Sequence, residues 1–263
     1  MHNIRSEKRK IIIVILNAKD IDYIKNLKKI DLSRAAFILM RQNPPFNMDY
    51  ITATFLLEKI SKKTRIVNDP FAVRNMPEKL YSTKFLKLMP PTIFTKSNNE
   101  IEKFKKKYKN IIIKPTHGYG GKNILFINKS TSKKKVSKYL KKHDHVMAQK
   151  FLPQIKLGDK RIFIIGGVIK GAIRRIPMKG SIVSNIGQGG KAVKTILTKR
   201  ELRIAKIVAS DLKKNKIVFA GIDLISNYLT GDINITSPTG LKNFKDLTGI
   251  DLAVDIWNYL EKN

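Results

Sequence analysis

A lysine at the end of a short apolar strand, followed at once by a glycine loop, is the part of this sequence with the clearest chemical meaning. Three consecutive isoleucines predict a buried strand that carries Lys114 at its end, and Gly118, Gly120 and Gly121 follow shortly after. Glycines allow the backbone to approach a ligand closely, so the N–H groups of such a loop can point at phosphate oxygens. The spacing differs from that of the helix-opening phosphate loop GxxxxGKS/T. Taken alone, the stretch is either a phosphate-binding hairpin loop or an ordinary glycine turn.

A second set of side chains suits a metal ion. Asp223 lies within an apolar predicted strand, where a carboxylate is costly unless it is paired or bound to a metal. Asp232 and Asn234 stand two residues apart and therefore on one face of the next predicted strand. Carboxylate and amide oxygens are hard ligands that suit Mg²⁺, which in turn suits a nucleotide phosphate. Because Asp232 follows Gly231, a solvated position in a hairpin turn is the alternative for this residue.

The elements that would position these groups alternate between strands and helices. Strands are expected at residues 11–16, 35–40, 64–67, 91–95, 111–114, 124–127, 146–152, 160–166, 168–176, 218–225 and 229–236. Helices are expected at residues 21–30, 48–60, 77–88, 131–142, 198–213 and 247–260, with another after Ser97, whose spacing from Glu100 predicts a capping box. The helix at 48–60 has amphipathic spacing of its apolar residues, at 48, 51, 55, 56, 57 and 60. Residues 177–192 form a long glycine-containing loop, which is either a functional lid or disordered.

The composition limits the class of protein. The 263 residues include 53 basic and 20 acidic side chains, a formal net charge of +33, which suggests a nucleic-acid binder. Most of the basic residues are lysines on predicted helix faces, with no aromatic residues interleaved, so we expect no specific nucleic-acid function. No stretch approaches the roughly 18 apolar residues of a membrane span. The lack of cysteine excludes disulfides and thiolate chemistry and favours a cytoplasmic location.

Motifs throughout the chain resemble those of the bacterial glutathione synthetase family, whose members are ATP-grasp ligases that join γ-glutamylcysteine and glycine. The resemblance begins near Ala35 and continues to the C-terminus, in the order in which the family carries its motifs. The matching stretches are 40–46 (MRQNPPF), 50–54 (YITAT), 78–80 (EKL), 112–115 (IIKP), 118–121 (GYGG), 147–153 (MAQKFLP), 158–161 (GDKR), 175–177 (RIP), 189–190 (GG), 221–223 (GID) and 234–240 (NITSPTG).

This resemblance implies an α/β (α+β) protein with the ATP-grasp fold and a shortened N-terminal α/β domain. We expect that N-terminal domain at residues 1–76 and the ATP-grasp domain at 77–263, with subdomains at about 77–148 and 149–263. The implied activity is ATP-dependent formation of glutathione through an acyl phosphate, with release of ADP and phosphate. A relative that joins another carboxylate and amine, and a degenerate member that binds nucleotide with weak ligation, are the alternatives.

The resemblance also implies a role for each matching residue. Lys79 and Lys114 would hold the ATP phosphates under the loop of Gly118, Gly120 and Gly121. The adenine pocket would be lined by Gln149, Phe151 and Leu152, with Asp159 near the nucleotide. Arg161 and Arg175 would face the acceptor carboxylate and the charge that develops on it. Asp223, Asp232 and Asn234 would bind Mg²⁺, with Mn²⁺ as a possible substitute. The implied partners are ATP, γ-glutamylcysteine, glycine and further copies of the chain in a tetramer.

The sequence departs from the family pattern at four places, which keep the degenerate alternative open. The part before the matching motifs is shorter than in the family. His117 stands where the family usually has aspartate. Residues 230–234 read TGDIN rather than Thr-Glu-Ile-Asn, so a glycine is inserted and a shorter acid must reach the metal. The lid carries IVSN at 182–185, where an arginine is usual.

Overall fold

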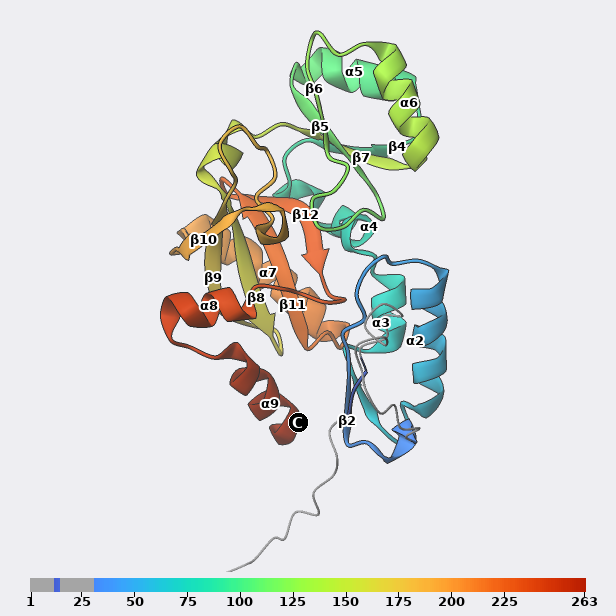
Figure 1. Ribbon diagram of the computed structural model, residues 1–263, viewed down its shortest axis with the longest axis vertical. Helices are drawn as coiled ribbons and strands as arrows, with labels where there is room; N and C mark the ends of the chain where they lie inside the picture. The colour runs from blue at the N-terminus through green and yellow to red at the C-terminus, as the bar shows by residue number, and fades with distance from the viewer. Residues whose placement is uncertain (1–11, 15–30) are drawn as a thin grey trace, which may run out of the picture.

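The computed structural model describes Ile12–Val14 and residues 31–263, which are organised around three β-sheets (Figure 1). The four-stranded sheet and its helices form one end of the molecule, the five-stranded sheet lies in the middle, and the three-stranded sheet stands beside it (Figure 1). The helix expected at 21–30 lies outside the described residues, as do residues 11, 15 and 16 of the first expected strand. In the part of the chain that the structure describes, no helix is long and apolar enough to cross a membrane.

The three-stranded sheet is parallel and matches the expected α/β opening. Its order is β1-β2-β3, and the 3₁₀ helix η1 (Leu32–Arg34) precedes β2. The elements are β1 (Ile12–Val14), β2 (Phe37–Met40), α2 (Met48–Ile60), β3 (Arg65–Val67) and α3 (Pro70–Asn75). The helix α2 connects β2 to β3, as a crossover between parallel strands requires.

The position of α2 was predicted correctly, but its buried face was not. The buried side chains are Tyr50, Thr54 and Leu57, whereas Phe55 and Leu56 are exposed. The apolar residues of α2 extend around more of the helix than one stripe, so their spacing did not identify the face that packs on the sheet.

The four-stranded sheet is antiparallel and has the order β4-β7-β5-β6. Its elements are β4 (Thr92–Thr95), α5 (Asn98–Tyr108), β5 (Ile111–Pro115), β6 (Leu125–Ile127), α6 (Lys133–His143) and β7 (Val146–Lys150). The helices α5 and α6 cover one face, where Ile111 and Ile113 are buried in a shared core. Since side chains alternate along a strand, Ile112 and Lys114 are directed to the opposite face. The expected subdomain boundary between 148 and 149 falls inside β7, all five residues of which pair in this sheet.

The start of α5 differs in one detail from the expected capping box. The Ser97 side chain accepts a hydrogen bond from the Glu100 N–H at 3.4 Å, as expected for an N-cap. The Glu100 carboxylate, however, accepts a hydrogen bond from the Thr95 hydroxyl, and that hydroxyl oxygen accepts from the Ser97 N–H at 2.9 Å. The Thr95 hydroxyl therefore stands between the Ser97 N–H and the Glu100 carboxylate, which a complete capping box would join directly.

The five-stranded sheet is antiparallel and has the order β10-β9-β8-β11-β12. Its strands are β8 (Asp159–Ile165), β9 (Val168–Ile176), β10 (Lys191–Lys194), β11 (Phe219–Ile225) and β12 (Tyr228–Asn234). The helix α7 (Lys199–Lys214) covers one face, and α8 (Leu241–Thr248) and α9 (Leu252–Lys262) cover the other. Successive side chains of β8 point to opposite faces of the sheet. Ile162 and Ile164 pack toward α7, and Phe163 and Ile165 pack toward α8 and α9.

The closing segment is two helices and not the single helix expected at 247–260. Gly249 ends α8 in the left-handed conformation, with φ of 79°, and its N–H donates to the Lys245 carbonyl at 2.8 Å. The Asp251 side chain then caps α9 by accepting from the Ala253 N–H at 3.0 Å. A glycine stop and a new N-cap thus interrupt a continuous apolar pattern.

Shorter elements connect the sheets at the place where the site forms. The helix expected at 77–88 is one turn of α-helix, α4 (Glu78–Tyr81), followed by the 3₁₀ helix η2 (Ser82–Leu88). The 3₁₀ helix η3 (Pro153–Leu157) follows β7. The loop expected at 177–192 contains the 3₁₀ helix η4 (Ile186–Gln188) and the start of β10.

Candidate active site

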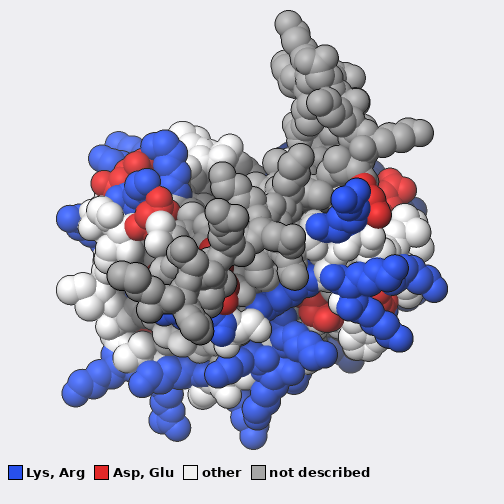
Figure 2. All heavy atoms as spheres, turned by 90° about the horizontal axis from the view of Figure 1, so that it is seen from below, with Lys and Arg blue, Asp and Glu red and all other residues white. Residues whose placement is uncertain are grey.

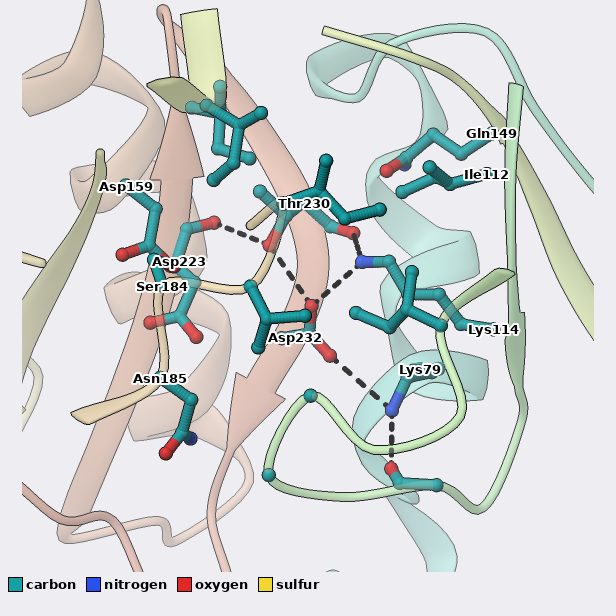
Figure 3. A pocket seen from close by; sticks show the side chains of 18 of the residues that line it. Lys79, Ile112, Lys114, Gln149, Asp159, Ser184, Asn185, Asp223, Thr230 and Asp232 are labelled. Atoms are coloured by element: carbon teal, nitrogen blue, oxygen red, sulfur yellow. Dashed lines mark hydrogen bonds and ion pairs between the residues drawn. The ribbon is translucent and has the colours of Figure 1, made fainter. Parts of the chain in front are cut away.

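A cleft lies between the four-stranded and five-stranded sheets and is bordered by α4 and the loop at 177–192. Every site residue expected from the sequence lines this one cleft. These residues are Lys79, Lys114, Gly118, Gly120, Gly121, Gln149, Phe151, Leu152, Asp159, Arg161, Arg175, Asp223, Asp232 and Asn234. Figure 3 shows that the labelled side chains come from both sheets, from α4 and from the loop at 177–192, and that Asp232 and the two lysines point toward one another across the cleft.

Two lysines from different elements converge on one carboxylate (Figure 3). Lys114 Nζ lies 2.9 Å from Asp232 Oδ2 and donates to the Thr230 carbonyl at 3.2 Å. Lys79 Nζ, from α4, lies 3.4 Å from Asp232 Oδ1 and donates to the Gly118 carbonyl at 2.5 Å. Burial by itself raises the pKa of Asp232, but Lys114 and Lys79 outweigh burial and hold that pKa well below its usual range. The site thus presents two ammonium groups side by side, as a polyphosphate requires.

The inserted glycine is absorbed by a bulge in the β11–β12 pair. Ile222 pairs with Ile233 and Leu224 pairs with Leu229, so Asp223 alone faces the three residues 230–232. Gly231 takes a positive φ of 87°, a conformation that side chains disfavour. The bulge carries Asp232 out toward the lysines, so the solvated turn that we considered for Asp232 is wrong.

Two arginines and two aspartates form a buried network on the five-stranded sheet. Arg161 grips Asp223 with two hydrogen bonds, of 2.5 and 2.9 Å, and donates to the Thr239 carbonyl at 3.3 Å. Arg175 bonds both oxygens of Asp159, with Nε at 2.9 Å, and its Nη2 lies 2.8 Å from Asp223. Burial raises the pKa of Asp159 despite Arg175, whereas Arg161 and Arg175 overcome burial and lower the pKa of Asp223. Arg175 is therefore engaged with two carboxylates of the protein, whereas we had expected it to face the acceptor carboxylate.

The wall expected to hold adenine comes from the end of β7. Gln149 is 3% exposed and donates to the Thr92 hydroxyl at 2.9 Å, which fixes its side chain against β4. The Phe151 ring packs edge-to-face on Phe126, with ring centroids 4.8 Å apart. These contacts leave Phe151 and Leu152 as the apolar lining at this end of the cleft.

The glycine loop and the loop at 177–192 touch each other over the cleft. Gln188 donates through its side-chain nitrogen to the Gly120 carbonyl at 2.5 Å. A Cβ atom on Gly121 would lie 2.5 Å from Val183 Cγ1, so the Val183 side chain packs directly on the glycine backbone. Val183 belongs to the stretch that lacks the family's usual arginine, and an apolar contact stands there instead. We call residues 177–192 the lid from here on.

A second cavity adjoins the first. It shares Glu78, Arg161 and Asn234 with the first cleft, as well as part of the glycine loop. One wall follows β2 and the other follows β12, with exposed His117 at its edge. The two walls include Asn43, Pro44, Phe46, Thr236, Ser237, Thr239 and Gly240.

Glu78 is a candidate residue to which our sequence analysis gave no role. It lines both cavities, and burial raises its pKa to about 7, with Lys79 opposing and Asp232 adding to the shift. Its position directly before Lys79, in a motif that matches the family, was the available signal.

The acids of the cleft fit a divalent ion that is completed by other oxygen ligands. Among the described residues, no group of three or more His, Asp or Glu side chains lies close enough to hold a metal ion. Asp223, Asp232 and Asn234 nevertheless line the same cleft. Asn234 donates through Nδ2 to the Gly221 carbonyl at 3.2 Å, so its amide oxygen is the atom left to act as a ligand. Two carboxylates and one amide oxygen suit an ion whose other ligands are phosphate oxygens and water.

The basic side chains outside the cleft are spread over the surface. Figure 2 shows one face of the molecule, on which Lys and Arg stand on several separate parts and outnumber Asp and Glu. On α5 and α6 the exposed positions include Lys103, Lys106, Lys134 and Lys138. This distribution agrees with lysines that decorate solvated helix faces.

Known proteins match this chain over most of its length. Two family models match the chain: "Prokaryotic glutathione synthetase, N-terminal domain" over residues 4–74, and "Prokaryotic glutathione synthetase, ATP-grasp domain" over residues 78–249. The first match starts well before Ala35, so the resemblance extends further toward the N-terminus than our motifs indicated.

Individual relatives give the same result. The chain is 40% identical over 240 residues to glutathione synthetase of Agrobacterium fabrum, covering 89% of this chain and 74% of the relative. It is 38% identical over 253 residues to glutathione synthetase of Buchnera aphidicola, covering 94% and 78%. Among solved structures, D-cycloserine synthetase DcsG aligns with a TM-score of 0.59 at 18% identity, over 80% of this chain and 78% of that one. Macrocyclase MdnC of Microcystis aeruginosa aligns with a TM-score of 0.62 at 15% identity, over 90% and 81%, a likeness of fold alone.

Proposed function

The chain belongs to the prokaryotic glutathione synthetase family, and we propose that the cleft between its four-stranded and five-stranded sheets is where it makes glutathione. The reaction joins γ-glutamylcysteine to glycine and converts ATP to ADP and phosphate. The observation that carries the assignment of the site is the convergence of Lys79 and Lys114 on Asp232 inside a cleft that also holds Asp223. We further propose that residues 1–76 are the N-terminal domain and 77–263 the ATP-grasp domain, a division supported by family matches that end at 74 and begin at 78.

The first step activates the acceptor. A carboxylate is a poor electrophile, so the terminal carboxylate of γ-glutamylcysteine takes the γ-phosphoryl group of ATP and becomes an acyl phosphate. Lys79 and Lys114 hold the phosphates, and the backbone of the glycine loop covers them. The family uses a divalent metal ion with ATP, and we propose Mg²⁺, replaceable by Mn²⁺, on Asp223, Asp232 and Asn234, where it would neutralise phosphate charge.

We assign the adenine ring to the end of the cleft away from the two lysines. Gln149, Phe151 and Leu152 line that end, with Asp159 on the opposite sheet. The buried amide and the apolar Phe151 ring suit a flat heterocycle with hydrogen-bonding edges.

The second step is attack by the glycine amine on the acyl carbon, with phosphate as the leaving group. Arg161 lines both cavities, so we assign it to the oxyanion that develops on the acyl carbon. Arg175 lies behind, between Asp159 and Asp223, and we assign it to orienting these carboxylates. The lid and the glycine loop together exclude the water that would hydrolyse the acyl phosphate.

The acceptor dipeptide fits the second cavity. This cavity adjoins the phosphate end of the cleft through Glu78 and Arg161, and a wall of it comes from the N-terminal domain. Its lining includes the polar side chains of Arg161, Asn234 and Thr239, which suit a dipeptide with charged ends. A cytoplasmic location and assembly into a homo-oligomer, a tetramer by resemblance to the family, remain predictions.

The test is a reaction with each component omitted in turn. Purified protein with ATP, Mg²⁺, γ-glutamylcysteine and glycine should release phosphate and form glutathione only when all four are present. ATP-dependent thermal stabilisation without turnover would contradict ligation and indicate a protein that only binds nucleotide. Glutathione formation that is unaffected by Lys114→Ala would contradict the site while leaving the activity in place.

A further inference from the structure

The side chain of Asn68 is buried and makes four hydrogen bonds to the main chain of a distant part of the sequence. It is 5% exposed. Its Nδ2 donates to the carbonyls of Phe219, at 2.8 Å, and Ile235, at 2.6 Å. Its Oδ1 accepts from the N–H groups of Val218, at 2.8 Å, and Phe219, at 2.9 Å. Because two donors and two acceptors are all used, only an amide of this length and orientation satisfies the site.

These bonds join the N-terminal domain to the strands that carry the acids of the cleft. Asn68 directly follows β3 of the three-stranded sheet. Phe219 begins β11 and Ile235 follows the last residue of β12. The same two strands carry Asp223 and Asn234, so one side chain holds the entrance of β11 and the exit of β12 together.

The exit of β12 leads straight into a wall of the second cavity. Thr236, Ser237, Thr239 and Gly240 line that wall, and this stretch starts one residue after Ile235, whose carbonyl Asn68 holds. The facing wall, with Asn43, Pro44 and Phe46, follows β2, the strand that pairs with β3. Arg41 makes a second link between the walls, by donating to the Pro238 carbonyl at 3.0 Å. The distance between the two walls therefore depends on where Asn68 holds Ile235.

We propose that Asn68 is a positioning residue for the acceptor, which sets the spacing of the two walls of the second cavity without lining that cavity itself. The proposal rests on the proposed function, because it takes the second cavity as the site of γ-glutamylcysteine. We assign ATP to the other cleft. Its two lysines, Lys79 and Lys114, bond to Asp232, Thr230 and Gly118 and not to Asn68 or residues 236–240, and the one bond described from that cleft to this segment is from Arg161 to the Thr239 carbonyl. Loss of the amide should thus weaken dipeptide binding much more than nucleotide binding.

The experiment compares Asn68→Asp and Asn68→Ala with wild type by calorimetric titration of γ-glutamylcysteine and of a non-hydrolysable ATP analogue, and by the KM of each substrate. Aspartate keeps the shape but removes both donors, so the Ile235 carbonyl is released. We expect the Kd and KM for the dipeptide to rise about tenfold and those for the nucleotide to stay within about twofold. Asn215→Ala is the control. The Asn215 amide directly follows α7 and donates to the Asp211 carbonyl at 2.8 Å and, at 3.5 Å, to the Tyr81 hydroxyl, and neither Asn215 nor Tyr81 lines a cavity. This variant should lower stability without changing either Kd.

Equal weakening of both ligands, or of neither, would overturn the positioning role. If the variants do not fold, hydrogen exchange on wild type decides: adding the dipeptide alone should slow exchange at residues 236–243 and at the Val218 and Phe219 N–H groups together. Unchanged exchange at Val218 and Phe219, with protection at 236–243, would contradict the proposal. A wild type that binds the ATP analogue but not γ-glutamylcysteine would overturn the proposed function, and this inference with it.

Discussion

Lys114 Nζ lies 2.9 Å from Asp232 Oδ2, although the strands that carry the two residues, β5 and β12, belong to different sheets. The pair spans the cleft, and Lys79 reaches the same carboxylate from α4. The Asp232 carboxylate thus holds the two lysines near the place where we assign the phosphates.

Lys114→Ala should lower glutathione formation by about 100-fold or more, because one positive charge on the transferring phosphoryl group is lost. The fold should survive, since the neighbouring Lys79 still pairs with Asp232. The measurement is kcat at saturating substrates, with circular dichroism as the check on folding. Lys84→Ala is the control, as that lysine pairs with Asp211 at 2.8 Å outside the cleft. Equal losses in the two variants would argue against a phosphate role for Lys114.

Arg175→Met should destabilise the protein strongly, because it leaves buried Asp159 without the guanidinium that bonds both its oxygens. Removal of one partner from a buried ion pair costs about 3–5 kcal/mol. Urea unfolding measures the change. The exposed pair of Lys242 and Asp246, at 2.6 Å, provides the control, since Lys242→Met should change stability by less than about 1 kcal/mol. An Arg175→Met protein as stable as wild type would show that the network is not a structural element.

Gln188→Ala should uncouple phosphate release from glutathione formation. The change removes the hydrogen bond between lid and glycine loop, so water reaches the acyl phosphate more often. We expect the ratio of phosphate to glutathione to rise from one to about two or more, with a smaller effect on the KM for ATP. Lys179→Ala, an exposed position on the same lid, is the matched control. A ratio of one in both variants would mean that the contact does not limit water entry.

Stability should fall with rising pH through the ionisation of Glu78. Burial raises the pKa of Glu78 from 4.5 to about 7, so between these values the folded protein binds more protons than the unfolded chain. The contribution of Glu78 is therefore fully present below pH 4.5 and is lost as pH rises through about 7.

The difference in unfolding free energy between wild type and Glu78→Gln, measured across this range, isolates that contribution. Groups common to both proteins cancel in the difference. Glu261→Gln, at an exposed position in α9, is the control and should give a flat difference. A flat difference for Glu78→Gln would mean that its carboxyl titrates in the folded protein as it does in the unfolded chain.

Local patterns in the sequence determined most elements and the membership of the site. The isoleucine run before Lys114 and the apolar run around Asp223 became β5 and β11, because strand formation depends on short-range alternation and burial. Every site residue expected from the motifs lines one cleft in the structure. This is possible because each motif lies within, or directly beside, a strand or helix whose position the fold dictates.

The partners of these side chains were decided by the tertiary structure alone. The bulge at Gly231, the placement of Arg175 between two carboxylates and the four bonds of Asn68 all join residues far apart in sequence or depend on strand register. The exposed side of α2, with Phe55 and Leu56, likewise depends on which neighbours cover the helix. Periodicity along one segment carries no information about which atoms of another segment will face it. Charge pairing inside a cleft depends on the distance between those atoms and on their burial, and only the tertiary structure determines both.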